Sequence, residues 1–204
     1  MDDGQTTFAR TVDLDDERTL TIEQEYESDV GGVVWDSALL ACDYFVRNKD
    51  HYKGKKVLEL GAGTGVCGLV LAALGSNVEI TDLPSRLPLI KKNYELNKDE
   101  CRGSVEIKAL DWATQMAPTE VDVLVLVDCI YYLKGVDPLI RTVLSCNAKE
   151  VLCVYERRDI GEPVEAQKYF SEAIVKHYEV IPVSNFYPVG SVCDDILAVN
   201  LIKK

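Results

Sequence analysis

The stretch KVLELGAGTGVCGLVLAALG at residues 56–75 decides the fold of this chain. Its first five residues are an apolar run typical of a buried strand, and a glycine-rich turn then leads into an apolar helix that Gly75 ends. Glycines in a strand-to-helix turn let a ligand approach the backbone amides at a helix N-terminus. The turn alone is a weak indication of a binding site, because any tight connection of this kind favours glycine.

Around this stretch, short apolar segments alternate with segments that have apolar residues at helical spacing. Such alternation predicts an α/β fold with a mostly parallel, doubly wound (Rossmann-like) sheet. Two closing strands, at 178–184 and 194–202, have no helix between them and predict an antiparallel hairpin at one edge of a seven-stranded sheet. We expect the other strands at 56–60, 77–81, 104–110, 121–127 and 150–155, and helices at 35–48, 66–75, 85–98, 137–146 and 163–177.

Residues 1–30 differ in charge from the rest of the chain. They contain ten acidic and two basic residues, a net charge of −8 out of −12 for the whole sequence. β-rich runs on either side of Asp15 and Asp16 predict an N-terminal β-hairpin arm, with a frayed acidic tail as the alternative. We therefore divide the chain into an acidic arm, 1–30, and one domain, 31–204.

Composition excludes several classes of protein. Lys and Arg number 22 against 34 Asp and Glu, which argues against nucleic acid as a partner and suits a basic one. No apolar run reaches eighteen residues, so we expect no membrane partner. Seven scattered Cys without a C-x-x-C pair, and only two His, encode neither a disulfide framework nor a metal site. We expect a monomer in the cytoplasm, with the nucleus as a second location.

Two carboxylates indicate which nucleoside cofactor the glycine turn accepts. Asp82 ends the second strand, 19 residues after Gly63, where it would meet ribose hydroxyls. Glu59 stands two residues before Gly61, where it would repel a pyrophosphate but balance an ammonium. Val66 replaces the third glycine of a dinucleotide motif. The pattern therefore favours S-adenosylmethionine over NAD.

Further polar and aromatic residues follow the third and fourth strands of the domain. Asp111 and Trp112 suit an adenine, although Trp112 alone could equally be an ordinary core or rim aromatic. Asp128, Tyr131 and Tyr132 come directly after the next strand. Because ligands of open α/β sheets bind beyond the carboxyl ends of the strands, we expect these residues to face the methyl end of the cofactor. The alternative is that Asp128 caps the helix that follows.

These residues resemble the class I methyltransferases and, more narrowly, the methyltransferase-like 21 group of protein lysine methyltransferases. The D-x-x-Y element from Asp128 to Tyr131 is typical of this group. Val127 departs from the group, which usually has a small alanine there. The similar stretches are VVWDSALL (33–40), VLELGAGTGVCGL (57–69), EITDLPSRLPLIKKNYELNK (79–98), LDW (110–112), VDCIYY (127–132) and VYERRD (154–159).

The resemblance and the residue pattern together assign a role to each candidate residue. Asp128 and Tyr131 are expected to be catalytic, with Tyr131 and Glu156 next to the substrate lysine. For Glu156, a solvated surface acid beside Arg157 and Arg158 is the alternative. The residues expected to bind the cofactor are Trp35, Glu59, Gly61, Ala62, Gly63, Asp82, Asp111, Trp112, Val127 and Tyr132.

The resemblance implies a protein-lysine N-methyltransferase that uses S-adenosylmethionine. The stretches DCIYY, YERR and KYF are most similar to members that act on valosin-containing protein, the p97 AAA ATPase. Other members of the group act on Hsp70 chaperones or elongation factors. A methyltransferase for a small molecule and a catalytically silent adaptor are the remaining alternatives.

Overall fold

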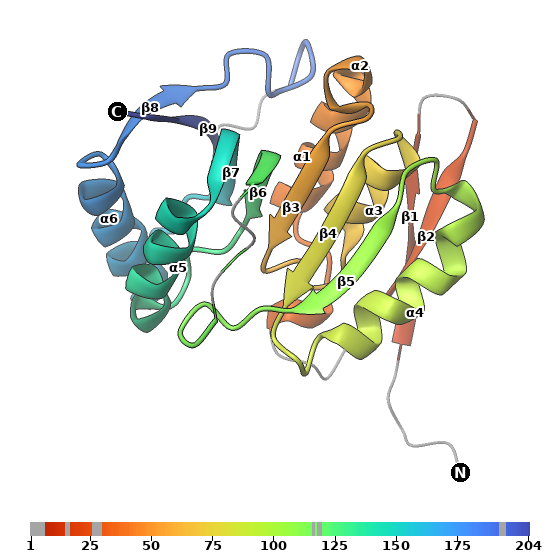
Figure 1. The fold of residues 1–204 in the computed structure, drawn as a ribbon, viewed down its shortest axis with the longest axis horizontal. Coiled ribbons are helices and arrows are strands. Elements are labelled where there is room, and N and C mark those ends of the chain that lie inside the picture. Colours follow the sequence, from red (N-terminus) through yellow and green to blue (C-terminus); the bar gives the residue numbers. More distant parts are fainter. Residues whose placement is uncertain (1–6, 15–16, 26–29, 116, 118–119, 192–194) are drawn as a thin grey trace.

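The computed structural model describes residues 7–14, 17–25, 30–115, 117, 120–191 and 195–204. Their centre is a seven-stranded sheet of order β5-β4-β3-β6-β7-β9-β8, with helices on both faces (Figure 1). A second sheet contains the two strands β1 and β2. The expected α/β fold class, with its seven-stranded sheet and its N-terminal hairpin, is confirmed.

The elements follow the predicted alternation along the chain. The strands are β1 (Thr7–Asp13), β2 (Thr19–Glu25), β3 (Lys56–Leu60), β4 (Asn77–Asp82), β5 (Val105–Ala109), β6 (Glu120–Val127), β7 (Asn147–Glu156), β8 (Tyr178–Pro182) and β9 (Ile196–Lys203). The helices are α1 (Asp36–Arg47), α2 (Lys49–Tyr52), α3 (Val66–Ala73), α4 (Leu87–Asn97), α5 (Leu133–Ser145) and α6 (Glu162–Ile174), with 3-10 turns η1 (Val30–Gly32) and η2 (Lys98–Glu100).

Alternate residues of the central strands belong to two hydrophobic clusters. Val57 of β3 packs in one cluster with α1 and α3, whereas its neighbour Leu58 packs in the other with α5 and α6. Val123 and Leu124 of β6 divide in the same way. All four side chains are at most 1% exposed. A strand buried on both faces needs continuous apolar sequence, which is why KVLEL and VDVLVLV lack polar alternation.

The last two strands form the expected antiparallel edge with one added detail. β9 pairs antiparallel with β7, for example Val151 with Leu201, and β8 pairs antiparallel with β9 on its other side. The later strand therefore lies inside the sheet and the earlier strand β8 lies at its edge (Figure 1).

The start of α5 differs from the sequence prediction. Proline usually stands in the first turn of a helix, so Pro138 indicated a helix beginning at residue 137. The helix instead begins at Leu133, and Pro138 lies inside it. The N–H of Leu133 donates to the Glu162 carboxylate of α6 at 2.8 Å, so a residue far along the chain caps this helix. Strand β7 likewise begins at Asn147, three residues before the predicted start.

The hairpin of β1 and β2 is attached to the domain through α4. Asn97 accepts the N–H of Thr21 at 2.8 Å and donates to the Thr21 carbonyl at 2.7 Å. Asn93 makes the same pair of bonds to Glu23, at 2.8 and 3.0 Å. Two side-chain amides thus replace the backbone of a neighbouring strand along β2.

The hairpin also shares the hydrophobic core. Leu20 and Ile22 are fully buried in the cluster that contains α1 and α3. The turn residues Asp15 and Asp16 lie outside the described residues. The division of the chain at residue 30 stays a prediction, but the described part of the arm packs as a layer of the domain.

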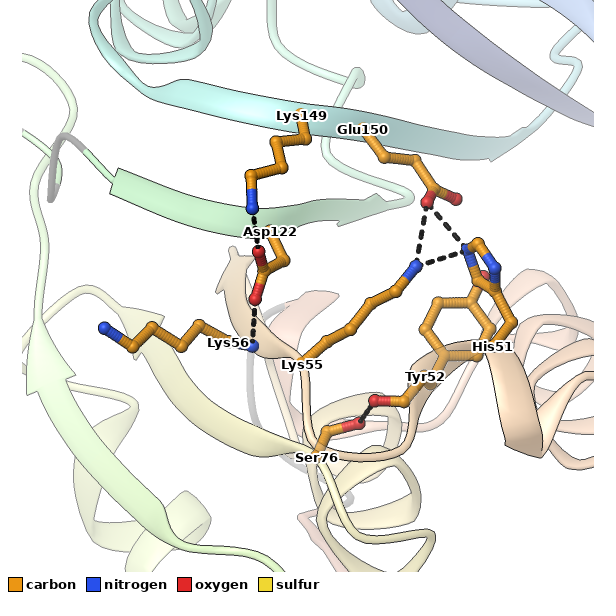
Figure 2. Close-up of polar contacts among 8 residues, drawn as sticks. All are labelled: His51, Tyr52, Lys55, Lys56, Ser76, Asp122, Lys149 and Glu150. Carbon is orange, nitrogen blue, oxygen red and sulfur yellow. Dashed lines mark hydrogen bonds and ion pairs between the residues drawn. The ribbon is translucent and has the colours of Figure 1, made fainter.

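The amino ends of the central strands are joined by ion pairs (Figure 2). The Asp122 carboxylate of β6 accepts the backbone N–H of Lys56 at 2.9 Å and the Lys149 ammonium at 2.7 Å. Glu150 of β7 pairs with Lys55 at 3.4 Å. These contacts connect β3, β6 and β7 at the edge of the sheet opposite the glycine turn.

Candidate functional site

A cavity of about 750 Å³ lies at the carboxyl ends of β3, β4 and β6. A cavity of this size accepts a ligand as large as a nucleoside cofactor. Its lining contains every residue expected to bind the cofactor, together with the expected catalytic residues Asp128 and Tyr131. Glu156 is not part of the lining. The parallel sheet explains the convergence, since it places the ends of distant strands at one edge.

The glycine turn lines the cavity, and two of its glycines stand where larger residues would not fit. Gly61 has φ +64° and Gly63 has φ +56°, in the left-handed region that favours glycine. A Cβ atom on Gly61 would lie 3.0 Å from the Cys129 sulfur and 3.1 Å from the Trp112 ring. A Cβ atom on Gly63 would lie 3.0 Å from the Gly31 carbonyl oxygen. The conformation and the close neighbours therefore both require glycine at these two positions.

Asp82 connects the end of β4 to the glycine turn. Its carboxylate accepts the N–H of Gly63 at 2.7 Å and the N–H of Leu83 at 2.6 Å. These bonds hold the carboxylate in the cavity lining beside the glycine turn, where ribose hydroxyls would meet it. The expected ribose contact is compatible with this geometry and stays a prediction.

Glu59 is a buried carboxyl group in the cavity lining. It is 2% exposed and accepts the N–H of Gly68 at 2.9 Å. Burial raises the pKa of Glu59 to about 8, the Gly68 N–H opposes this shift, and the charge of Asp82 adds to it. A Cβ atom on Gly68 would come within 2.4 Å of the carboxylate. A cation that enters the cavity would favour the ionised form of Glu59.

The indole of Trp112 offers a buried donor. Its Nε1–H has no hydrogen-bond partner among the described residues. A buried donor without a partner is costly, so an acceptor on a bound ligand would stabilise it. Two acids for an ammonium and a ribose, a glycine turn that a ligand can approach closely, and this N–H suit the groups of S-adenosylmethionine. The residues present therefore fit that cofactor.

Asp128 has an unusual backbone and several partners. Its φ is +53°, rare for a residue other than glycine. The Ser37 hydroxyl donates to Oδ2 at 2.6 Å, and the N–H of Glu156 donates to Oδ1 at 3.2 Å. Arg158 lies 3.8 Å from Oδ2. The carboxylate thus joins α1, β6 and the end of β7.

Aromatic rings and cations form the other end of the cavity. The rings of Tyr131 and Tyr132 meet edge to face with centroids 4.7 Å apart. The Lys134 ammonium lies 5.5 Å from the Tyr132 centroid, and the Arg158 guanidinium lies 5.4 Å from the Trp35 centroid. Aromatic rings attract cations through their faces, so the rings at this end suit a cationic side chain of a substrate.

Sequence reasoning missed several residues of the site. Ser37 had a usable signal, since it lies two residues after Trp35 in a quoted stretch. Arg158 was considered only as a neighbour of Glu156, with which it pairs at 2.8 Å. Ile160, 85% exposed at the cavity, gave no signal because a single apolar residue in a loop is unremarkable. The expected contact between Glu156 and the substrate stays a prediction.

Two features, a metal-binding cluster and a membrane-spanning helix, are absent from the described residues. In the described ranges, no three His, Cys, Asp or Glu side chains gather as a metal ion would require. Among the same residues, no helix has the length and apolar character needed to cross a membrane.

The fold and the cavity define the class of S-adenosylmethionine-dependent methyltransferases with a Rossmann-like sheet. A family model described as lysine methyltransferase matches residues 14–177. The chain belongs to this lysine methyltransferase family.

Curated relatives agree with the family. EEF1A lysine methyltransferase 3 of Mus musculus is 33% identical over 79% of this chain and 70% of its own length. Protein-lysine N-methyltransferase EFM6 of Saccharomyces cerevisiae is 31% identical over 78% of this chain and 75% of its own length. A Xenopus tropicalis EEF1A lysine methyltransferase 3 is 39% identical, but the match covers only 56% of that protein. The expected group of protein lysine methyltransferases is thus confirmed, without a particular substrate.

Solved structures show the same fold at low sequence identity. A 16S rRNA methyltransferase of T. thermophilus, in complex with AdoMet and guanosine, has a TM-score of 0.63 at 16% identity and covers 97% of this chain and 51% of its own. The magnesium protoporphyrin IX methyltransferase of Synechocystis, with bound SAH, has a TM-score of 0.57 at 11% identity and covers 82% of each chain. At these identities the likeness shows the fold alone.

Proposed function

We propose that this protein transfers methyl groups from S-adenosylmethionine to a lysine side chain of a partner protein. EEF1A is the first candidate partner and a p97-type AAA ATPase is the second. The observation that carries the proposal is a single cavity with two chemically different ends. One end has the acids and the glycine turn that suit the cofactor, and the other has the aromatic rings that suit a lysine.

Exposed apolar side chains at the cavity favour a protein substrate over a small molecule. Trp35 is 36% exposed, Tyr132 45% and Ile160 85%. All three line the cavity. Apolar side chains that remain exposed beside a site are typical of surfaces that bind another protein. A small substrate would be enclosed by the cavity and would leave this rim unused.

The reaction requires a neutral lysine at the reacting end. A pH of 7 is about 3.4 units below the ordinary lysine pKa of ~10.4, so forming the neutral amine costs about 4.6 kcal/mol. Burial of the amine among rings lowers its pKa and offsets part of this cost. When bound, the cofactor supplies an activated methyl group on a sulfonium. Aligning the amine with that group is the task of this chain's residues.

Asp128 and Tyr131 are proposed to receive and orient the lysine. The Asp128 carboxylate attracts the ammonium as it enters. The remaining lone pairs of the carboxylate can accept a hydrogen bond from it. Tyr131 limits the width of the channel with its ring, which also attracts a cation through its face. Val127 and Tyr132 complete the wall beside the methyl group in this proposal.

Different observations favour the two candidate partners. The relatives that cover most of this chain include a protein named for EEF1A. The stretches DCIYY, YERR and KYF instead resemble members that act on p97. The cytoplasmic location and monomeric state expected from the sequence belong to the same proposal.

The proposal is tested by offering purified EEF1A and purified p97 separately, with labelled S-adenosylmethionine. Label in one protein, located to a lysine by mass spectrometry, supports the function and selects the partner. The Asp82→Ala variant is the control, because transfer by this chain requires its cofactor contacts. If the wild type binds the cofactor by calorimetry but labels neither of these proteins nor any in a lysate, the silent adaptor replaces this proposal.

A further inference from the structure

We infer that Ser37 is a positioning residue for methyl transfer. Its hydroxyl holds the Asp128 carboxylate and thereby fixes the segment 128–132, which carries Tyr131 and Tyr132. The inference rests on the proposed function, since the reaction is one of its readouts. It assigns a task in the reaction to a serine in the first turn of α1.

The backbone at Asp128 needs external contacts to keep its conformation. A positive φ is unfavourable for a residue with a side chain and persists where surrounding contacts enforce it. The N–H of Asp128 donates to the Val154 carbonyl of β7 at 2.8 Å, which fixes one side of the residue. The carboxylate is fixed by Ser37 and by the N–H of Glu156. The residues that follow this left-handed turn, 129–132, line the cavity.

Ser37 is well placed to impose this conformation. It is fully buried and belongs to α1, which packs against α3 in the larger hydrophobic cluster. Its bond to Asp128 Oδ2, at 2.6 Å, is short, as expected for a hydroxyl that donates to a carboxylate. Trp35, which immediately precedes α1, lines the same cavity. One rigid helix therefore sets both the Trp35 wall and the Asp128 turn.

Two other roles are possible for a buried serine beside a cofactor cavity. It could merely fill space in the core, or it could contact the cofactor itself. Ser37→Ala removes only the hydroxyl and leaves the packing of α1 nearly unchanged. If the serine acts through Asp128, the loss of the hydroxyl matters only while the carboxylate is present. Asp128→Gly removes the carboxylate and tolerates a positive φ, so it is a suitable partner for a double-mutant cycle.

The experiment uses the full chain and two readouts. Thermal unfolding of wild type, S37A, D128G and the double variant measures the coupling between the two residues. We expect S37A to lower the melting temperature of the wild type and to leave that of D128G unchanged. Methyl transfer and calorimetry then compare S37A with wild type. We expect kcat to fall about ten-fold, while the cofactor Kd changes less than about two-fold.

Three results would overturn the inference. They are an equal loss of melting temperature in both backgrounds, an unchanged kcat in S37A, or a cofactor Kd weakened as much as kcat is reduced. Ser171→Ala is the matched control, because Ser171 lies on the surface of α6 and its hydroxyl bonds only to its own helix at Lys168 among the contacts described. If wild-type protein methylates no protein, the proposed function fails instead, while the unfolding cycle still tests the contact between Ser37 and Asp128.

Discussion

The two ends of the central strands use polar residues in opposite ways. We call the side with the amino ends of β3, β6 and β7 the amino edge, and the side with the glycine turn the carboxyl edge. At the amino edge the acids have partners within the chain: Asp122 accepts the backbone N–H of Lys56 and pairs with the Lys149 ammonium, and Glu150 contacts both Lys55 and His51 (Figure 2). At the carboxyl edge, the buried carboxyl group of Glu59 accepts one hydrogen bond among the described residues, from the N–H of Gly68. The Trp112 indole N–H has no partner among those residues.

The backbone differs between the edges at one residue. Glycines have positive φ at both edges, Gly54 and Gly75 at the amino edge and Gly61 and Gly63 at the carboxyl edge, but Asp128 adds a residue other than glycine at the carboxyl edge. A fold stabilises itself by satisfying its polar groups, so groups left unsatisfied around a cavity indicate a place for a ligand. The amino edge therefore satisfies its charged groups within the chain, whereas the carboxyl edge keeps polar groups that a ligand can use. This division between the two edges can be tested at both of them.

The largest effect is expected for Asp128→Asn. The amide keeps the shape of the side chain and can still accept from Ser37, but it removes the charge that receives a lysine. We expect kcat to fall about 100-fold while the cofactor Kd stays within about three-fold. Steady-state methylation and calorimetry measure the two quantities. Product formation at the wild-type rate would show that Asp128 is only a structural turn.

A smaller but still large effect is expected for Asp82→Ala at the same edge. The variant removes the proposed ribose acceptor and the bond that holds Gly63. A hydrogen bond to a charged group contributes roughly 1.5–3 kcal/mol, so the cofactor Kd should rise by about one to two orders of magnitude. Calorimetry checks the affinity, and circular dichroism checks that the fold is intact. Unchanged affinity in a folded variant would falsify the ribose role.

Glu59→Gln tests the electrostatics of the carboxyl edge through pH. The folded-state pKa of about 8 lies above the ordinary value of 4.5. The folded state therefore favours protonated Glu59 more than the unfolded state does, and protonation stabilises the fold. This contribution is complete below about pH 4.5 and is lost as pH rises through about 8. Denaturant unfolding between pH 5 and 8 should therefore show a loss of stability in wild type that is smaller in E59Q. Parallel curves for the two proteins would contradict the assignment.

Ile160→Asp tests the exposed rim that we assign to the protein substrate. A charge in place of an apolar contact should raise KM for the protein substrate by about ten-fold, with the cofactor Kd unchanged. Val189→Asp is the matched control, because Val189 is likewise a highly exposed apolar residue but is not part of the cavity lining. An equal KM for both variants would show that Ile160 does not contact the protein substrate.

The smallest effect is expected at the amino edge, for Lys149→Ala. The Lys149 side chain is 81% exposed, and exposed ion pairs contribute at most about 1 kcal/mol. The free energy of unfolding should fall by less than about 1 kcal/mol, and methyl transfer should not change. Denaturant unfolding and the labelled assay measure both. A loss of activity here would break the division between the two edges.

Features that depend on a local sequence pattern were predictable from the sequence. The run KVLEL, the glycine turn and Asp82 identify a parallel sheet and the edge where a ligand binds, because buried strands and left-handed turns restrict residue type locally. The same applies to the position of the cavity, since every expected cofactor residue lies in its lining.

Features that depend on distant partners were not predictable in this way. The start of α5 at Leu133 depends on Glu162, 29 residues later, so the local signal of Pro138 was misleading. The role of Asn93 beside β2 depends on a hairpin 70 residues earlier. The bond from Ser37 to Asp128 spans 91 residues. A side chain that acts across the fold leaves no periodicity in its own segment.

The position of β9 between β7 and β8 has a consequence for the order in which the sheet is assembled. During synthesis, β8 leaves the ribosome before β9, the strand that separates it from β7. Until β9 arrives, β8 has no backbone partner in the sheet, and the free side of β7 is an open edge that other chains could pair with. Completion of this half of the sheet is therefore delayed until residues 196–203 are available. A nascent chain halted before that point would expose β7 to aggregation, although the glycine turn and β3–β6 were already complete.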